Sequence, residues 1–254
     1  MISEETVKKF FTSCQNHFQE YLKEYWQIDT SDQLIEQIFR GVPSEGTNCR
    51  YLFLVFQTYN IIPESCFDCY KILIEPRNVV ELFKLMLVFE KLVLPNDNSR
   101  KCMIEIRPET SGTYKGLVYS FNLNEANNLL NIVRKVISQE ISADVPVNMK
   151  RGCSEYSLVY QKYAMFKKNG KPIMQYKKKW QKYEKLAERI NLGRDLVPIP
   201  KTFNKPGYDL NDAKAMIAWL KYAATINDLS YKKITDQDIR QLSDLNRPPF
   251  KEIK

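Results

Sequence analysis

Apolar and polar positions in the middle of the chain follow two different periods in turn, which predicts alternating strands and helices. Four short runs rich in β-branched and aromatic residues are bounded by proline or turn-forming residues, as strands are. Two longer segments repeat apolar residues at steps of three and four, the spacing of a helix with one buried face. These patterns predict strands at 69–76, 101–108, 114–121 and 145–150, and helices at 77–94 and from about 124 to 141.

The order strand, helix, strand, strand, helix, strand is that of the ferredoxin-like split βαβ fold (βαββαβ). We therefore expect an α+β protein whose sheet has the strand order 4-1-3-2. The fourth strand contains Pro146, which favours an edge position because proline cannot donate a ladder hydrogen bond. Both helices are expected to cover one face of the sheet and to leave the other free.

The N-terminal part of the chain is predicted to be helical. A strong amphipathic helix extends to about Trp26, and a shorter helix, capped by Thr30 or Ser31, runs through Phe39. The apolar and aromatic run at 51–62 fits a buried helix or a buried strand, because its periodicity does not separate the two.

Helices are also expected after the centre, at 175–190, at 210–226 and over a short stretch from 235. A linker with three prolines separates the first two of these helices. The expected organisation is an N-terminal helical segment packed on the core (1–62), a ferredoxin-like α+β core (63–160) and a basic, mostly helical C-terminal region (161–254).

Side chains alternate between the two faces of a strand, so the strand segments predict which residues share a face. One set is apolar and is expected to face the helices. The other set is too charged for a core, and it fits a solvated face, a face covered by flanking segments, or a binding surface. Glu75 and Glu105 on that face fit cross-strand ion pairs or acid–base chemistry. The apolar set is Ile72, Ile74, Ile104, Ile106 and Val118, and the charged set is Lys71, Glu75, Met103, Glu105, Arg107, Lys115 and Tyr119.

Positive charge is concentrated in one segment of the chain. Residues 150–189 hold twelve Lys or Arg and three acidic residues, a local charge of +9, whereas the whole chain carries +8. Lysines neutralise phosphates, and Tyr or Trp side chains stack on bases. With the open sheet face, this segment predicts nucleic-acid binding through Lys71, Arg107, Lys115, Tyr119, Lys150, Arg151, Lys177, Lys178, Lys179 and Lys182.

Two other interpretations of the basic segment remain open. Its helix fits a solvated face with Tyr176, Trp180 and Tyr183 packed on the body of the protein. It also fits a docking surface for an acidic protein partner.

Four of the six cysteines fall at the predicted strand ends. Cys66 and Cys69 form a C-x2-C pair, Cys102 begins the second strand and Cys153 follows the fourth. If these ends meet at one end of the sheet, four thiolates there would hold zinc or an iron–sulfur cluster. The alternatives are ordinary burial of Cys69 and Cys102, or a thiol/disulfide role for the C-x2-C pair.

The sequence also disfavours several classes of function and location. His17 is the one histidine, so Ser-His-Asp or Cys-His catalysis would depend on it alone. The chain has no GxGxxG or GxxxxGK[ST] motif, which disfavours dinucleotide and P-loop chemistry. It has no long uncharged apolar stretch and no secretory h-region, so we expect no membrane partner and, with few cysteines for a disulfide scaffold, a cytoplasmic setting.

The sequence does not specify a reaction, and enzymatic activity stays open. The leading hypothesis is a non-enzymatic nucleic-acid-binding (RNA or DNA) or nucleoprotein-associated protein. The alternatives are a small metalloprotein or redox enzyme centred on the four cysteines, and an interaction subunit of a larger complex.

Overall fold

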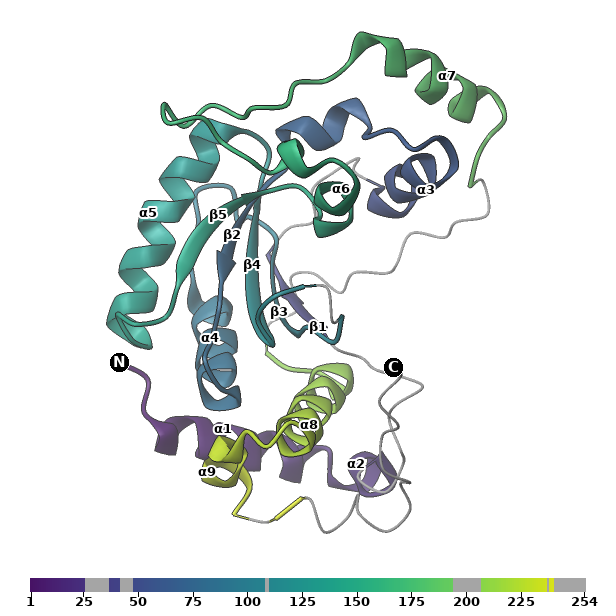
Figure 1. The fold of residues 1–254 in the computed structure, drawn as a ribbon. Helices are drawn as coiled ribbons and strands as arrows, with labels where there is room; N and C mark the ends of the chain where they lie inside the picture. The colour runs from purple at the N-terminus through teal and green to yellow at the C-terminus, as the bar shows by residue number, and fades with distance from the viewer. Residues whose placement is uncertain (26–36, 42–47, 108–109, 194–206, 237, 240–254) are drawn as a thin grey trace, which may run out of the picture.

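The computed structural model describes residues 1–25, 37–41, 48–107, 110–193, 207–236 and 238–239. It is an α+β structure built on a five-stranded sheet in which every neighbouring pair of strands is antiparallel. The strand order is β1-β3-β4-β2-β5 (Figure 1). The strands are β1 (Gln37–Arg40), β2 (Tyr70–Ile74), β3 (Arg100–Ile104), β4 (Tyr114–Ser120) and β5 (Val147–Arg151).

Two helices, α4 (Val79–Lys91) and α5 (Leu123–Glu140), pack against one face of this sheet. Each begins at an asparagine with extended backbone. The Asn78 side chain accepts from the backbone N–H of Glu81, and the Asn122 side chain accepts from that of Glu125. Such caps satisfy backbone donors that the first turn of a helix leaves free. The helices predicted at 77–94 and from about 124 to 141 are therefore confirmed.

Side-chain alternation predicts the buried sheet face well within the strands. Ile72, Ile74, Ile104 and Val118 are fully buried in the core that α4 and α5 cover. The prediction for Ile106 is wrong: β3 ends at Ile104, and Ile106 is 43% exposed. Alternation ceases to apply where the chain leaves the sheet.

Strand β1 corrects the prediction of a helix through Phe39. Gln37–Arg40 pairs antiparallel with β3, with Ile38 opposite Cys102. The edge of β3 offers backbone donors and acceptors, and pairing with β1 satisfies them. The first part of the predicted helix, 26–36, lies outside the described residues.

N-terminal and C-terminal helices pack together at one end of the sheet (Figure 1). The predicted first helix is divided at Phe18, and the helix predicted at 210–226 is confirmed. Trp219 is fully buried, and its ring meets that of Phe83 in α4 edge-on, with 5.7 Å between the ring centres. The helices are α1 (Glu4–His17), α2 (Gln19–Tyr25), α8 (Leu210–Thr225) and α9 (Lys232–Thr235).

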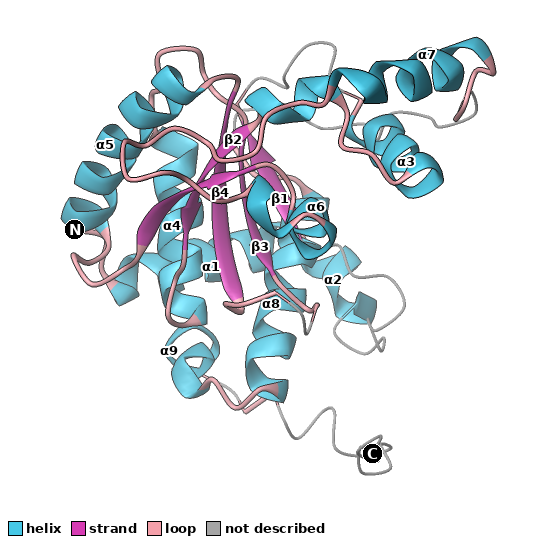
Figure 2. Cartoon of the chain, turned by 45° about the horizontal axis from the view of Figure 1, so that its top comes forward, coloured by secondary structure: helices cyan, strands magenta, loops and turns pink. Residues whose placement is uncertain are grey.

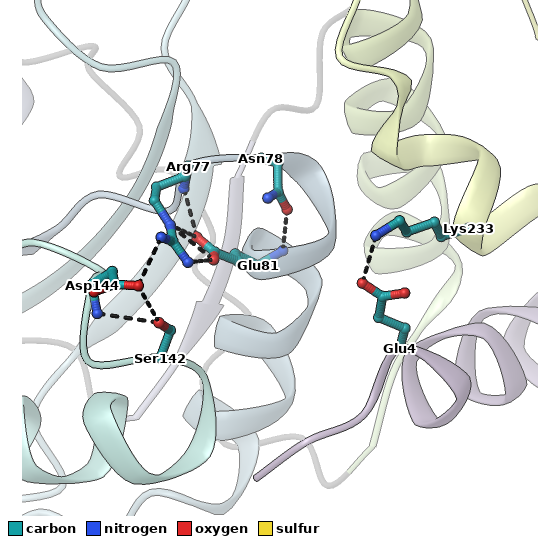
Figure 3. A network of polar contacts seen from close by, with 7 residues as sticks. All are labelled: Glu4, Arg77, Asn78, Glu81, Ser142, Asp144 and Lys233. Carbon is teal, nitrogen blue, oxygen red and sulfur yellow. Dashed lines mark hydrogen bonds and ion pairs between the residues drawn. The ribbon is translucent and has the colours of Figure 1, made fainter.

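Polar contacts support these junctions (Figure 3). Lys233 of α9 lies 2.8 Å from the carboxylate of Glu4 in α1. Arg77, just before α4, pairs with Glu81 and, across 3.3 Å, with Asp144 in the turn after α5. The Glu4–Lys233 and Arg77–Asp144 contacts join segments far apart in the sequence.

A second, smaller hydrophobic core lies at the other end of the sheet. Phe56, Phe67, Tyr156, Tyr163 and Trp180 form its buried centre. The run at 51–62 is a helix as far as Tyr59. The elements are the helices α3 (Cys49–Tyr59), α6 (Ser154–Val159) and α7 (Gln181–Arg189) and the 3-10 turns η2 (Glu64–Asp68), η3 (Gln161–Tyr163) and η4 (Lys178–Trp180).

These two cores group the chain differently from the three segments predicted from the sequence. The range 1–62 contributes α1 to the larger core and α3 to the smaller one, and 161–254 is divided in the same way between α8 and α7. Within the described ranges, no helix is long and apolar enough to cross a bilayer.

Candidate functional site

A cavity of about 600 Å³ lies on the sheet face that α4 and α5 leave free. Strand residues form its floor, and residues of η2, of the start of α6 and of the segment after β3 form its walls. Figure 2 shows α6 in front of this face. A cavity of this volume lies in the range that small ligands occupy. The sheet face that α4 and α5 leave free is therefore partly covered, and it contains a cavity.

Strand pairing brings the predicted charged side chains together on the cavity floor. Lys71 of β2 pairs with Tyr119 of β4 on one side and with Lys150 of β5 on the other. Lys115 of β4 pairs with Met103 of β3. Directly opposed residues share a face, so all five side chains line the cavity.

The charged lining of the cavity is positive overall. Five basic residues face three acidic ones, a net charge of +2. The basic residues are Lys71, Lys101, Arg107, Lys115 and Lys150, and the acidic residues are Asp68, Glu105 and Glu155.

Glu105 is buried and held by cations on two sides. Its carboxylate accepts from Arg107 Nε at 2.7 Å and from Lys115 Nζ at 3.2 Å. Burial by itself raises the pKa of Glu105. The hydrogen bonds from Arg107 and Lys115 outweigh burial and lower the pKa to about 2. Arg107 also pairs with Glu155, and its two carboxylate partners raise its pKa. The ion-pair interpretation of Glu105 therefore fits better than acid–base chemistry at neutral pH.

Lys71 is the least compensated cation of the cavity. It is 8% exposed, and its Nζ lies 3.4 Å from Cys153 Sγ and 5.3 Å from the centre of the Tyr119 ring. Burial lowers its pKa, but the neighbouring Cys153, Tyr119 and Cys69 outweigh burial and keep the pKa well above its ordinary value. Among the described residues, no carboxylate forms an ion pair with Lys71.

Lys150 lies beside Lys71, and the charges of neighbouring lysines affect its pKa. Its Nζ donates to Ser154 Oγ at 2.5 Å. Burial, followed by the positive charges of Lys71 and Lys115, lowers the pKa of Lys150. The positive charges of Lys71 and Lys115 therefore disfavour the charged form of Lys150.

Aromatic side chains also line this cavity. Tyr119 lies on the floor, and Phe39 and Phe121 complete the set. Phe121, just beyond β4, is 50% exposed. An exposed ring beside several ammonium groups offers a stacking surface next to positive charge.

Arg151 does not belong to the cavity. It pairs with Tyr70, whose side chain lies in the core on the helix side of the sheet, and it is buried. Its guanidinium donates to the carbonyls of Phe67 and Met174, both at 2.7 Å, and lies over the ring of Tyr163. Alternation within β5 places Arg151 on the opposite face from Lys150, so its prediction as a nucleic-acid contact is corrected to a structural role.

The lysine-rich segment is exposed, but its aromatic residues are not free to stack on bases. Trp180 is buried in the smaller core, and Tyr176 and Tyr183 pack against that core. This confirms the interpretation that these rings pack on the body. The predicted contacts Lys177, Lys178, Lys179 and Lys182 are exposed on η4, α7 and the residue before them, outside the cavity lining.

Of the four cysteines predicted as metal ligands, Cys66, Cys69 and Cys153 lie near one another, whereas Cys102 lies apart from them. Cys102 is buried in the core on the helix side, and Cys66 lies in the smaller core with its Sγ 3.4 Å from Tyr156 Oη. Only Cys69 and Cys153 of the predicted set line the cavity, where Cys49 joins them. Across the described ranges, no group of three or more His, Cys, Asp or Glu residues is placed to hold a metal ion.

Alternation along β3 explains why Cys102 lies apart from the other cysteines predicted as ligands. Cys102 shares a face with Ile104, so it points away from Cys69, which shares a face with Lys71. Burial also raises the pKa of the Cys66 thiol to about 12 and that of Cys69 to about 11.

Several cavity residues were missing from the predicted set. Lys101 and Phe121 carried a signal, because they continue the alternation of Met103 and Tyr119 along their strands. Cys49 had no such signal, since the position of α3 depends on packing between distant segments. Comparisons with protein-family models, with curated proteins and with solved structures give no match for this chain.

Proposed function

We propose that this protein binds single-stranded nucleic acid, RNA or DNA, on the free face of its sheet, as a non-enzymatic binding protein. The observation that carries this proposal is the positively charged cavity with the half-exposed Phe121 beside it. Ammonium groups replace the counterions of phosphates, and aromatic rings stack on unpaired bases. A duplex hides the faces of its bases, so the ring favours a single strand.

The scaffold that we propose for this site is the ferredoxin-like split βαβ arrangement, extended by β1 at one edge. Strands β2, β3, β4 and β5 take the first to fourth places of that arrangement along the chain. Read from β5, their order is 4-1-3-2, and both connecting helices lie on one face. In this arrangement, the sheet face that the two helices do not cover is available to bind a ligand.

The exposed lysines of η4 and α7 extend the positive surface beyond the cavity. Because their neighbouring rings are packed away, they would contribute charge alone. Such contacts to phosphates do not depend on the base sequence of the strand, and they weaken as the salt concentration rises. The same lysines would suit an acidic protein partner, but the cavity has the same sign of charge and favours nucleic acid as the common ligand.

Fluorescence anisotropy with a labelled 12-nucleotide single strand tests this proposal. We expect the affinity to fall at least tenfold between about 50 and 200 mM salt, because several phosphate contacts release counterions. Lys71→Met and Phe121→Ala should each weaken binding about tenfold, through loss of an ammonium group and of a stacking ring.

Matched control variants separate the cavity from general charge. Lys135→Met removes an exposed lysine from α5, on the opposite face, and Tyr21→Ala removes an exposed ring from α2. Both should bind as the unaltered protein does. Binding that is insensitive to salt, or that Lys135→Met weakens as much as Lys71→Met, would contradict the proposal.

A further inference from the structure

Three lysines from three neighbouring strands line the cavity floor. Lys71 and Lys150 are directly paired residues of β2 and β5, and Lys115 comes from β4 on the other side of β2. The positive charges of Lys71 and Lys115 both act on Lys150. These three lysines are called the lysine cluster below.

The protein supplies only part of the negative charge that this cluster needs. Lys115 has Glu105, which it shares with Arg107, and Arg107 has Glu155 as a second partner. If Arg107 and Glu155 balance each other, the lysine cluster and Glu105 carry a net charge of +2. Lys71 and Lys150 have a thiol and a hydroxyl as their hydrogen-bond partners.

Burial makes this excess of positive charge unfavourable in the absence of a bound anion. A buried ammonium group without a counter-charge is unfavourable, because it has lost water and gained no anion. Lys71 is more than nine-tenths buried and lines the cavity. An anion bound in the cavity would replace the missing counter-charge.

We propose that the lysine cluster binds a terminal phosphate monoester, so that the cavity receives the end of a nucleic-acid strand. This inference rests on the nucleic-acid binding proposed above and deepens it. A terminal phosphate carries a charge of about −1.5 to −2 at pH 7, whereas an internal phosphodiester carries a single negative charge. The charge of the cluster therefore matches the strand end and not the middle of a strand.

The walls of the cavity favour the same ligand. Residues of η2 (Ser65 and Asp68), of the segment after β3 (105–107) and of the start of α6 (153–155) line the cavity beside the floor. A strand end that reaches Lys71 would lie against these segments. Phe121 also lines the cavity and offers its ring to the terminal base.

The test compares one 12-nucleotide strand with a 5′-phosphate, with a 3′-phosphate and with hydroxyl groups at both ends, carrying an internal fluorophore. One phosphorylated strand should bind at least tenfold more tightly than the hydroxyl strand. Lys71→Met and Lys150→Met should abolish this preference, and Lys135→Met should keep it. Lys150 is partly exposed, so its variant keeps the test valid even if Lys71→Met fails to fold.

The outcomes separate the two proposals. Equal binding of all three strands would overturn the terminal-phosphate site and leave nucleic-acid binding intact. No binding of any strand would overturn both. Displacement of the strand by an equal concentration of a nucleoside monophosphate would overturn the assignment to a strand end, because a free mononucleotide would then satisfy the site.

Discussion

At the residue scale, the cavity combines one compensated group with one uncompensated group. Glu105 is held by Arg107 and Lys115, whereas Lys71 has Cys153 within hydrogen-bond distance, the ring of Tyr119 beyond it, and no carboxylate partner in the part of the chain that the structure describes. Both side chains are buried. Breaking the first arrangement leaves Lys115 without its carboxylate and Arg107 with Glu155 alone, while replacing Lys71 by an apolar residue removes a buried amine without a carboxylate partner. The two sites should therefore respond to mutation in opposite ways.

Glu105→Gln tests the compensated group. The folded-state pKa of about 2 lies below the ordinary 4.5, so Glu105 stabilises the fold above pH 4.5, and this contribution is lost as the pH falls toward 2. We expect the variant to lose about 1–3 kcal/mol of unfolding free energy at pH 7 in urea titrations. The gap to the unaltered protein should shrink below pH 4.5. Glu20→Gln, at an exposed position of α2, should change little, and a gap that is constant down to pH 3 would refute the argument.

At the element scale, the junction between β5 and α6 shapes one wall of the cavity. Gly152 ends the strand with φ of +57°, and its N–H donates to the Cys69 carbonyl at 2.8 Å. This turn places Cys153 and Ser154 beside Lys71 and Lys150. A Cβ atom at Gly152 would lie 2.0 Å from Tyr163 Oη, so the turn requires glycine for both its conformation and its space.

Gly152→Ala should therefore destabilise the protein strongly, by about 2–4 kcal/mol in urea unfolding. Gly170→Ala is the matched control, because Gly170 has φ of +75° and no atom within 4 Å of the added Cβ. That variant should cost only about 1 kcal/mol, for its conformation alone. Equal losses of unfolding free energy in the two variants would mean that the clash with Tyr163 does not contribute to the effect of Gly152→Ala.

At the scale of the whole molecule, two hydrophobic cores hold different parts of the chain. The larger joins the sheet, α4 and α5 with the helices from both ends of the chain, and the smaller joins α3, α6 and α7. The cavity is lined by residues of the sheet and of elements of the smaller core, among them α3, η2 and α6. Motion of the smaller core would therefore alter the walls of the site while its floor stays in place.

Hydrogen exchange on two tryptophan variants measures this division. Trp219→Ala should cost about 3–5 kcal/mol and speed exchange in α1, α4 and the sheet, because Trp219 is fully buried in the larger core. Trp180→Ala should speed exchange in α3, α6 and α7 and leave α4 and α5 protected. If both variants affect the same amides, the two cores unfold as one unit.

The sequence by itself determined the local elements at the centre and the sides that their residues face. Asn78 and Asn122 mark two helix starts, and alternation placed Lys71, Lys115 and Tyr119 on one face. These features depend on neighbours a few residues apart, which caps and periodicity report directly.

Tertiary structure alone decided the strand β1, the burial of Arg151, the separation of Cys102 from the other predicted ligands and the walls of the cavity. Each depends on segments distant in the sequence: β1 on the edge of β3, Arg151 on carbonyls of Phe67 and Met174, and the cavity walls on the packing of η2 and α6. Local patterns set which face a residue lies on, but only the packing of remote elements sets what it meets there.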